Sequence, residues 1–252
     1  MLYKIKQGSP PIINMKKTFF GFVYALLSFL CLQAQAQIKN WEEIGTYISK
    51  DSVTKGKYTL IFINRDSAFQ ESGDPIKKRM IDAFFTVYPK EAKRFNKKTA
   101  RKVTFVIDPA YEGVAAASSG IIRFSPKWML TQPGDIDVVT HEVFHIVQSY
   151  PHRAGPGWLT EGITDYVRYK FGVDNAGANW SLPDYNPKQS YTNSYRITGR
   201  FLAWAEKNVN KKIVDELDAA LRTKTYTPET WTKLTGKTVD ELWQMYAQNP
   251  KL

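Results

Sequence analysis

Apolar runs in the first half of the chain predict two buried β-strands with a helix between them. Residues 57–64 (KYTLIFIN) and 103–107 (VTFVI) are rich in β-branched and aromatic side chains, which is typical of strands in a sheet core. Residues 76–95 carry apolar side chains at helical spacing, so they predict a helix that Pro89 bends or breaks. Residues 113–125 begin with small side chains and predict one short strand.

The pattern becomes helical in the second half of the chain. Residues 136–150 (IDVVTHEVFHIVQSY) repeat apolar side chains at helical spacing, with Asp135 as the expected N-cap and Pro151 after the end. Further helices are expected at 159–171, 193–207 and 211–221, and after the capping-box start Thr238-x-x-Glu241. Because strands come first and helices later, the order predicts an α+β domain with a small mixed sheet and a mostly helical C-terminal part.

The first 36 residues differ from the rest and predict an export signal. They contain four lysines, no acidic residue and an apolar run over 19–32, and they end in Ala34-Gln35-Ala36, which is the order of a cleavable signal peptide. The run of about 14 apolar residues is too short for a membrane-spanning helix, which needs roughly 20. We expect translation to start at Met15, after an upstream extension, and cleavage to follow Ala36. Residues 37–252 then form a single domain.

Composition limits the chemistry of the mature chain. The only cysteine, Cys31, lies within the predicted signal, so the mature chain has neither disulfides nor thiolate metal ligands. Removing the four basic residues of the signal from the total of 35 leaves 31 against 24 acidic ones, a net charge of +7. Anionic cell-surface polymers are candidate partners of this basic surface. The lysines are scattered without interleaved aromatic residues, which argues against a specific nucleic-acid site.

The motif His141-Glu142-x-x-His145 lies in the predicted helix 136–150. Histidines at i and i+4 share one helix face, so the two imidazoles can bind one Zn²⁺. Glu142 lies beside the metal and can take a proton from a zinc-bound water and pass it to a leaving group. The chain has only 3 histidines, and a chance match is expected on the order of 10⁻³ times per chain of this composition.

A hydrolytic zinc site needs a third protein ligand and one open position. His152 is one residue late for the metzincin pattern, in which the third histidine follows six residues after the second. Glu161 and Asp165 are spaced i, i+4 on one face of the predicted helix 159–171. We expect Glu161 to be the ligand and Asp165 to accept the spare N–H of a ligating histidine. The alternatives for Asp165 are a ligand role or a salt bridge to Arg168.

These motifs resemble known peptidases. The segment WLTEGITDY is similar to the Trp-Leu-x-Glu-Gly segment that supplies the third zinc ligand in gluzincin aminopeptidases, which matches Glu161. Together, THEVFHIVQSY, PGWLTEGITDYVRYKFG and YRITGRFLAW resemble the basic secretory protein family, plant and bacterial proteins regarded as metallopeptidases. The resemblance covers roughly residues 60–205, including FFTVYPKEAKRFN and VTFVIDPAYEGVAA. It implies a secreted, zincin-like catalytic domain.

Two further sets of site residues follow from this resemblance. In related gluzincins a tyrosine or histidine on a later helix stabilises the oxyanion, and Tyr195 matches that position, with Tyr191 as the alternative. In zincins an edge strand binds extended substrate by backbone pairing. We expect that edge at Gly113, Val114, Ala115 and Ala116, with a close-packed turn as the alternative.

The expected function is a secreted or periplasmic zinc metallopeptidase that acts on peptides or proteins. No motif offers an acidic group to capture a substrate amine, which favours an endopeptidase over an aminopeptidase. Two alternatives stay open: a zinc hydrolase of a non-peptide bond such as a cell-wall amide, and a non-enzymatic basic secreted protein with structural zinc.

The signal assignment predicts the N-terminus of the exported protein. N-terminal sequencing should give Gln37 as the first residue, because the small residues at positions 34 and 36 suit signal peptidase. A mature chain that keeps the apolar run would contradict this assignment.

Overall fold

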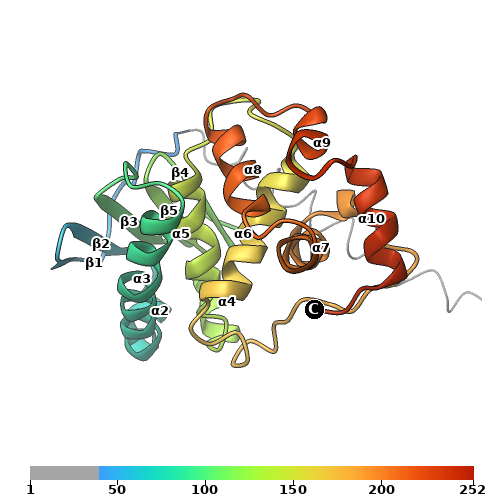
Figure 1. The fold of residues 1–252 in the computed structure, drawn as a ribbon. Coiled ribbons are helices and arrows are strands. Elements are labelled where there is room, and N and C mark those ends of the chain that lie inside the picture. Colours follow the sequence, from blue (N-terminus) through green and yellow to red (C-terminus); the bar gives the residue numbers. More distant parts are fainter. Residues whose placement is uncertain (1–39) are drawn as a thin grey trace, which may run out of the picture.

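The computed structural model describes residues 40–252, so the predicted signal peptide lies outside the described residues. A five-stranded mixed sheet forms one side of the molecule (Figure 1). In order across the sheet, the strands are β1 (Ser49–Lys55), β2 (Tyr58–Asn64), β3 (Lys102–Ile107), β5 (Ile121–Phe124) and β4 (Ala115–Ser118).

The three central strands are parallel, and each edge strand is antiparallel to its neighbour. The expected strands at 57–64 and 103–107 are confirmed as β2 and β3. The single strand expected at 113–125 is instead the β4–β5 hairpin. Ser119 and Gly120 reverse the chain with φ values of 51° and 76°, and two successive positive φ values are typical of a two-residue hairpin turn. β4 is the edge strand on this side of the sheet.

Two helices, α3 (Asp74–Arg94) and α5 (Val138–Gln148), pack against each other beside the sheet (Figure 1). Their common core is aromatic: the ring of Phe105 on β3 contacts Phe84 of α3 and Phe62 and Phe124 of the neighbouring strands. Helix α3 continues through Pro89 to Arg94, so the possible break there does not occur. Buried side chains on both sides of Pro89 hold the helix against the core.

The C-terminal part is helical, as expected for this α+β chain (Figure 1). The capping box at Thr238 and Glu241 is confirmed by reciprocal hydrogen bonds of 3.2 and 2.7 Å. The helices of this part are α6 (Gly157–Phe171), η1 (Tyr191–Asn193), α7 (Tyr195–Asn208), α8 (Ile213–Arg222), α9 (Glu229–Thr235) and α10 (Val239–Gln248). Two short helices, α2 (Ser67–Ser72) and α4 (Pro126–Thr131), precede them.

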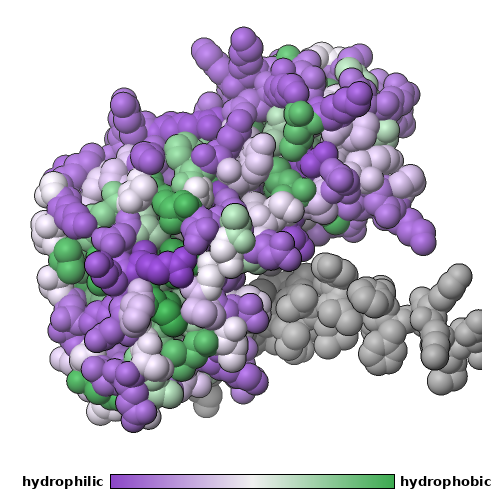
Figure 2. Space-filling model, turned by 90° about the horizontal axis from the view of Figure 1, so that it is seen from below, coloured by the Kyte–Doolittle hydropathy of each residue, from purple (hydrophilic) through white to green (hydrophobic). Residues whose placement is uncertain are grey.

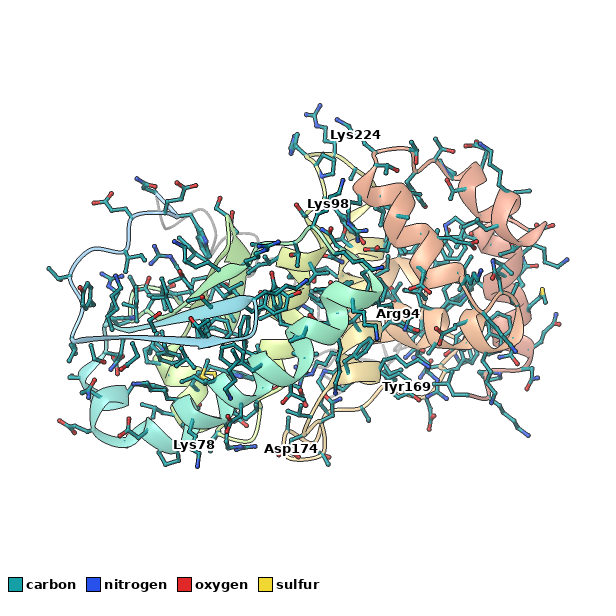
Figure 3. All side chains as sticks on the ribbon, turned by 60° about the vertical axis from the view of Figure 1, so that its left-hand side comes forward. Lys78, Arg94, Lys98, Tyr169, Asp174 and Lys224 are labelled. Atoms are coloured by element: carbon teal, nitrogen blue, oxygen red, sulfur yellow. The ribbon has the colours of Figure 1, made fainter. Side chains whose placement is uncertain are left out.

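Arg94 at the end of α3 links the sheet side to the C-terminal helices (Figure 3). Its guanidinium donates to Asp215 of α8 at 2.7 Å, to Glu206 of α7 at 3.0 Å and to the Tyr166 hydroxyl of α6 at 3.0 Å. Planar guanidinium groups suit such multiple contacts. One side chain thus connects α3 to three later helices.

Helix α5 begins at Val138 with Asp137 as its N-cap, so the expectation of Asp135 as N-cap is wrong. The carboxylate of Asp135 instead accepts hydrogen bonds from Arg168 at 2.6 Å and the Trp128 indole at 3.0 Å. Asp137 accepts from the Thr140 hydroxyl and from the backbone N–H of Val173, both at 2.7 Å. It therefore ties the start of α5 to the segment after α6.

The visible surface is largely hydrophilic, with hydrophobic residues in small groups (Figure 2). Within residues 40–252, no helix has the length and apolar character needed to cross a membrane.

Helices α6 and α7 approach closely because glycines face the contact. A Cβ atom added to Gly162 would lie 2.2 Å from the Thr198 methyl carbon, and one added to Gly199 would lie 3.1 Å from the backbone nitrogen of Tyr166. Larger side chains at these positions would force the two helices apart.

Gly162→Ala should therefore destabilise the protein, whereas Gly157→Ala on the same helix should not. Overpacking costs about 2 kcal/mol, which corresponds to a fall in Tm of roughly 6 °C for a chain of this size. A Cβ at Gly157 meets open space. Thermal unfolding followed by circular dichroism measures both variants, and equal Tm values would contradict the close contact.

Candidate functional site

Helices α5 and α6 bring His141, His145 and Glu161 together. The Oε2 atom of Glu161 lies 3.3 Å from Nε2 of His141 and 3.5 Å from Nε2 of His145. One potential ligand atom from each residue lies within 4.8 Å of the other two. The side chain of Glu161 is 26% exposed, so the group is accessible from solvent. The predicted triad is therefore assembled in space.

Hydrogen bonds orient both imidazoles so that Nε2 faces Glu161. His141 Nδ1 lies 2.8 Å from Oδ1 of Asp165, which is the contact expected for that carboxylate. A carboxylate accepts, so Nδ1 carries a proton, and Nε2 is the atom that can bind a metal once it is deprotonated. Arg168 pairs with Asp135 at 2.6 Å, so the alternative salt bridge to Asp165 is not formed.

His145 is oriented by Gln148, which sequence reasoning missed as a site residue. The Gln148 amide nitrogen donates to the Thr160 carbonyl at 3.0 Å and to the Thr164 hydroxyl at 3.1 Å. Its Oε1 is therefore the atom that accepts from His145 Nδ1, at 2.8 Å. This arrangement again leaves Nε2 as the atom that can bind a metal.

Glu142 follows His141 on α5, and its side chain is buried. Its Oε2 atom makes no hydrogen bond with any described residue, and only 6% of the residue is exposed. Burial raises the pKa of Glu142, and the neighbouring histidines oppose that rise. A carboxylate with a raised pKa is a better proton acceptor than an exposed one.

The charge of Glu161 suits a cation. Burial alone would raise the pKa of Glu161, but His145 and His141, when protonated, lower it well below the ordinary value, so the carboxylate carries a negative charge. Its Oε2 atom makes no well-formed hydrogen bond with the described residues. A buried anionic oxygen facing the Nε2 atoms of two imidazoles fits a divalent cation that prefers nitrogen and oxygen ligands, as zinc does.

Of the two candidate tyrosines, Tyr195 lies at the triad and Tyr191 does not. The Tyr195 ring is nearly parallel to the His141 imidazole, with 18° between the planes and 6.3 Å between the centroids. The Tyr191 hydroxyl donates to Asp240 at 2.7 Å, and its ring packs on Trp158. Burial and Asp240 raise the pKa of Tyr191 to about 12.

His152 lies in the exposed segment after α5 and is not part of the triad. Helix α5 ends at Gln148, and Ser149 takes a left-handed conformation with φ 45°. The helical spacing that aligns His141 and His145 therefore does not extend to His152.

The predicted substrate edge lies at the start of β4, next to α5. Gly113 and Val114 precede the strand, and the Val114 carbonyl accepts from the Ser125 N–H at 3.0 Å. In an antiparallel pair successive residues alternate between facing the partner and facing outward, so the backbone groups of Ala115 face the open edge. The Ala115 carbonyl accepts a hydrogen bond from the Tyr111 hydroxyl at 2.9 Å.

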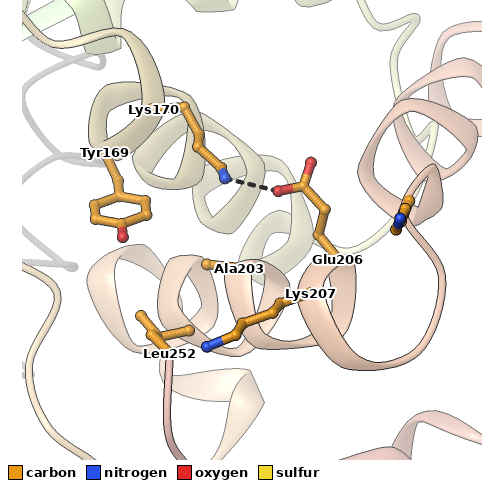
Figure 4. A pocket seen from close by; sticks show the side chains of 7 residues that line it. Tyr169, Lys170, Ala203, Glu206, Lys207 and Leu252 are labelled. Carbon is orange, nitrogen blue, oxygen red and sulfur yellow. Dashed lines mark ion pairs between the residues drawn. The ribbon is translucent and has the colours of Figure 1, made fainter.

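A separate hollow of about 450 Å³ lies beside α6 and α7 and contains none of these residues (Figure 4). Its wall includes Lys170, whose ammonium pairs with Glu206 at 2.8 Å. Glu206 also accepts from Arg94 and Tyr166. The only acidic side chain that lines the hollow is thus bound to three other side chains. The residues that line the hollow therefore include no group of catalytic side chains comparable to the triad.

A protein-family model described as "Peptidase of plants and bacteria" (BSP) matches residues 64–246, more than half of the chain. The chain belongs to this family. The resemblance to the basic secretory proteins is thereby confirmed, and the matched range includes the triad, Glu142 and Tyr195. A search of curated proteins finds no match.

The triad predicts which residues would hold a metal in this BSP-family chain. Titration of the metal-free protein with zinc in a calorimeter should show one site per chain. Glu161→Ala should weaken zinc binding by more than about 100-fold. A loss of about 100-fold is the most expected for a residue that only hydrogen-bonds to a metal ligand. His152→Ala is the control and should bind as the parent does. Loss of zinc in the His152 variant with retention in the Glu161 variant would overturn the assignment.

Proposed function

We propose that this protein is a zinc-dependent metallopeptidase that hydrolyses internal peptide bonds, and that it acts outside the cytoplasm. The observation that carries the proposal is the convergence of His141, His145 and Glu161 within 4.8 Å, with the buried carboxylate of Glu142 on the same helix as the histidines. Membership of a peptidase family supports the reaction class, and the predicted signal peptide supports export.

The protein's own residues divide the work of hydrolysis. Zinc, when bound, would polarise the scissile carbonyl and lower the pKa of the attacking water. Glu142 accepts the proton of that water, and its raised pKa lets it hold the proton until the leaving amine takes it. Asp165 and Gln148 keep the two imidazoles in their metal-binding tautomer.

Tyr195 is the proposed donor to the oxyanion. Its ring lies beside His141, where a phenolic hydroxyl can reach a carbonyl positioned at the metal. The Tyr191 hydroxyl instead donates to Asp240 of α10.

The proposed substrate is an extended peptide that pairs with the open edge near Gly113–Ala116. Backbone pairing is tolerant of side chains, which suits an endopeptidase. Since the Ala115 carbonyl is occupied by Tyr111, we expect the other outward backbone groups of this edge to contribute most of the pairing.

Glu142→Gln tests the catalytic role against a structural zinc. The variant should keep its zinc and its fold, while kcat/KM on a peptide library falls by about 10²–10⁴-fold, the range for a lost general base. Glu71→Gln, an exposed change of the same kind on α2, should leave activity unchanged. Product mass spectrometry identifies the bonds cleaved.

Two results would redirect the proposal. If every peptide that the zinc-loaded parent cleaves is cleaved equally by the Glu142→Gln variant, or if the parent cleaves none, the zinc is structural and the protein is a binding protein. If only cell-wall fragments are cleaved in a Glu142-dependent manner, the enzyme is an amide hydrolase of another class.

A further inference from the structure

Two consecutive residues at the start of α7, its N-cap Ser194 and its first residue Tyr195, have backbone conformations that residues other than glycine rarely adopt. Ser194 has φ 69° and ψ −176°, and Tyr195 has φ 50°. The first combination lies in a region that is essentially restricted to glycine, and the second is left-handed, which is unfavourable for a bulky side chain. The joint between η1 and α7 is therefore strained at the residue that enters the candidate site.

Contacts on both sides keep this joint in place. Before it, the Asn193 side chain accepts from the Ser190 N–H at 2.6 Å, and the Thr198 hydroxyl donates to the Tyr191 carbonyl at 2.5 Å. After it, Thr198 packs on Gly162 at the contact between α6 and α7. Strained conformations persist when the surrounding structure holds them in this way.

The strain at Ser194 favours movement of the Tyr195 ring away from His141. The conformation that brings the Tyr195 ring over His141 is the strained one, so relaxation of Ser194 to an ordinary φ would turn the Cα–Cβ bond of Tyr195 away. Compared with glycine, serine at position 194 makes the state with the Tyr195 ring beside His141 less favourable relative to the state with the ring turned away. A glycine would remove the strain and favour the ring at the site.

We propose that Ser194 is a positioning residue that keeps Tyr195 movable, so that the phenol can leave His141 when substrate enters or product departs. This inference rests on the proposed function, in which Tyr195 donates to the oxyanion. Turns that change conformation around a reaction commonly control turnover, and their residues need not touch substrate. The flanking contacts return Tyr195 to the same place after each movement.

Ser194→Gly and Ser194→Ala separate the backbone strain from the hydroxyl. Alanine keeps a Cβ atom and therefore the strain, so it should resemble the parent. Glycine should raise the Tm of the metal-free protein by about 2–4 °C. It should also slow amide exchange at Thr198, whose N–H donates to the Ser194 carbonyl at 3.4 Å, by about tenfold because the joint opens less often.

The functional expectation for Ser194→Gly is a fall in kcat of about tenfold with zinc affinity unchanged, because release of the ring becomes slow. Lys224→Gly is the matched control, since Lys224 also has a positive φ of 57° and lies after α8. It should leave kcat unchanged. Full kcat in Ser194→Gly, or no rise in Tm and no slower exchange, would overturn the inference.

Tyr195→Phe distinguishes this inference from the proposed function. Loss of activity in Tyr195→Phe with full activity in Ser194→Gly would leave the oxyanion role standing and overturn only the role of Ser194. Full activity in Tyr195→Phe would instead reject the oxyanion role itself, and the functional role of Ser194 with it.

Discussion

The whole site depends on helix α6, which lies between α5 and α7 and contacts both. Successive residues of a helix point about 100° apart, so Glu161 can face the histidines of α5 while Gly162 faces Thr198 of α7. Glycine at 162 lets α7 come close enough for Tyr195 to reach His141. A small change in the spacing of α6 and α7 would move the tyrosine relative to the triad.

This arrangement concentrates charge in a poorly solvated place, and other parts of the fold compensate. Burying an unpaired carboxylate is costly, so such groups are paired or take up a proton. Asp165 is paired with His141, whereas Glu91 on α3 is fully buried with neither carboxylate oxygen hydrogen-bonded to a described residue. Burial and the nearby Asp137 raise the pKa of Glu91 well above its ordinary value. The raised pKa favours the neutral form of Glu91, which adds no negative charge beside the site.

The sequence was informative where one periodicity determined the outcome. The i, i+4 spacings of His141 with His145 and of Glu161 with Asp165 predict a site if two helices form and face each other. Helices α5 and α6 form and face each other in this way. The strands β2 and β3 were likewise predictable, because strands at the centre of a sheet are apolar on both faces. Strand β1 was missed because it is an exposed edge with polar residues, and its pairing with β2 leaves no apolar pattern to detect.

What sequence could not supply were the contacts that depend on three-dimensional neighbours. Gln148 lies three residues after His145, where the metzincin pattern has glycine, and nothing in the linear sequence marks it as a partner of that histidine. In the fold its amide connects His145 to Thr160 and Thr164 on α6. Asp135 and Asp137 are equally good N-caps by residue type, and only the folded structure places Asp135 against Arg168 and Asp137 against the Val173 N–H. The strain at Ser194 has no sequence signal either, because a serine before a helix normally indicates an ordinary cap. The contacts that orient the site residues are thus the hardest to predict from sequence. Each joins two elements, and the sequence pattern of either element alone does not reveal the other.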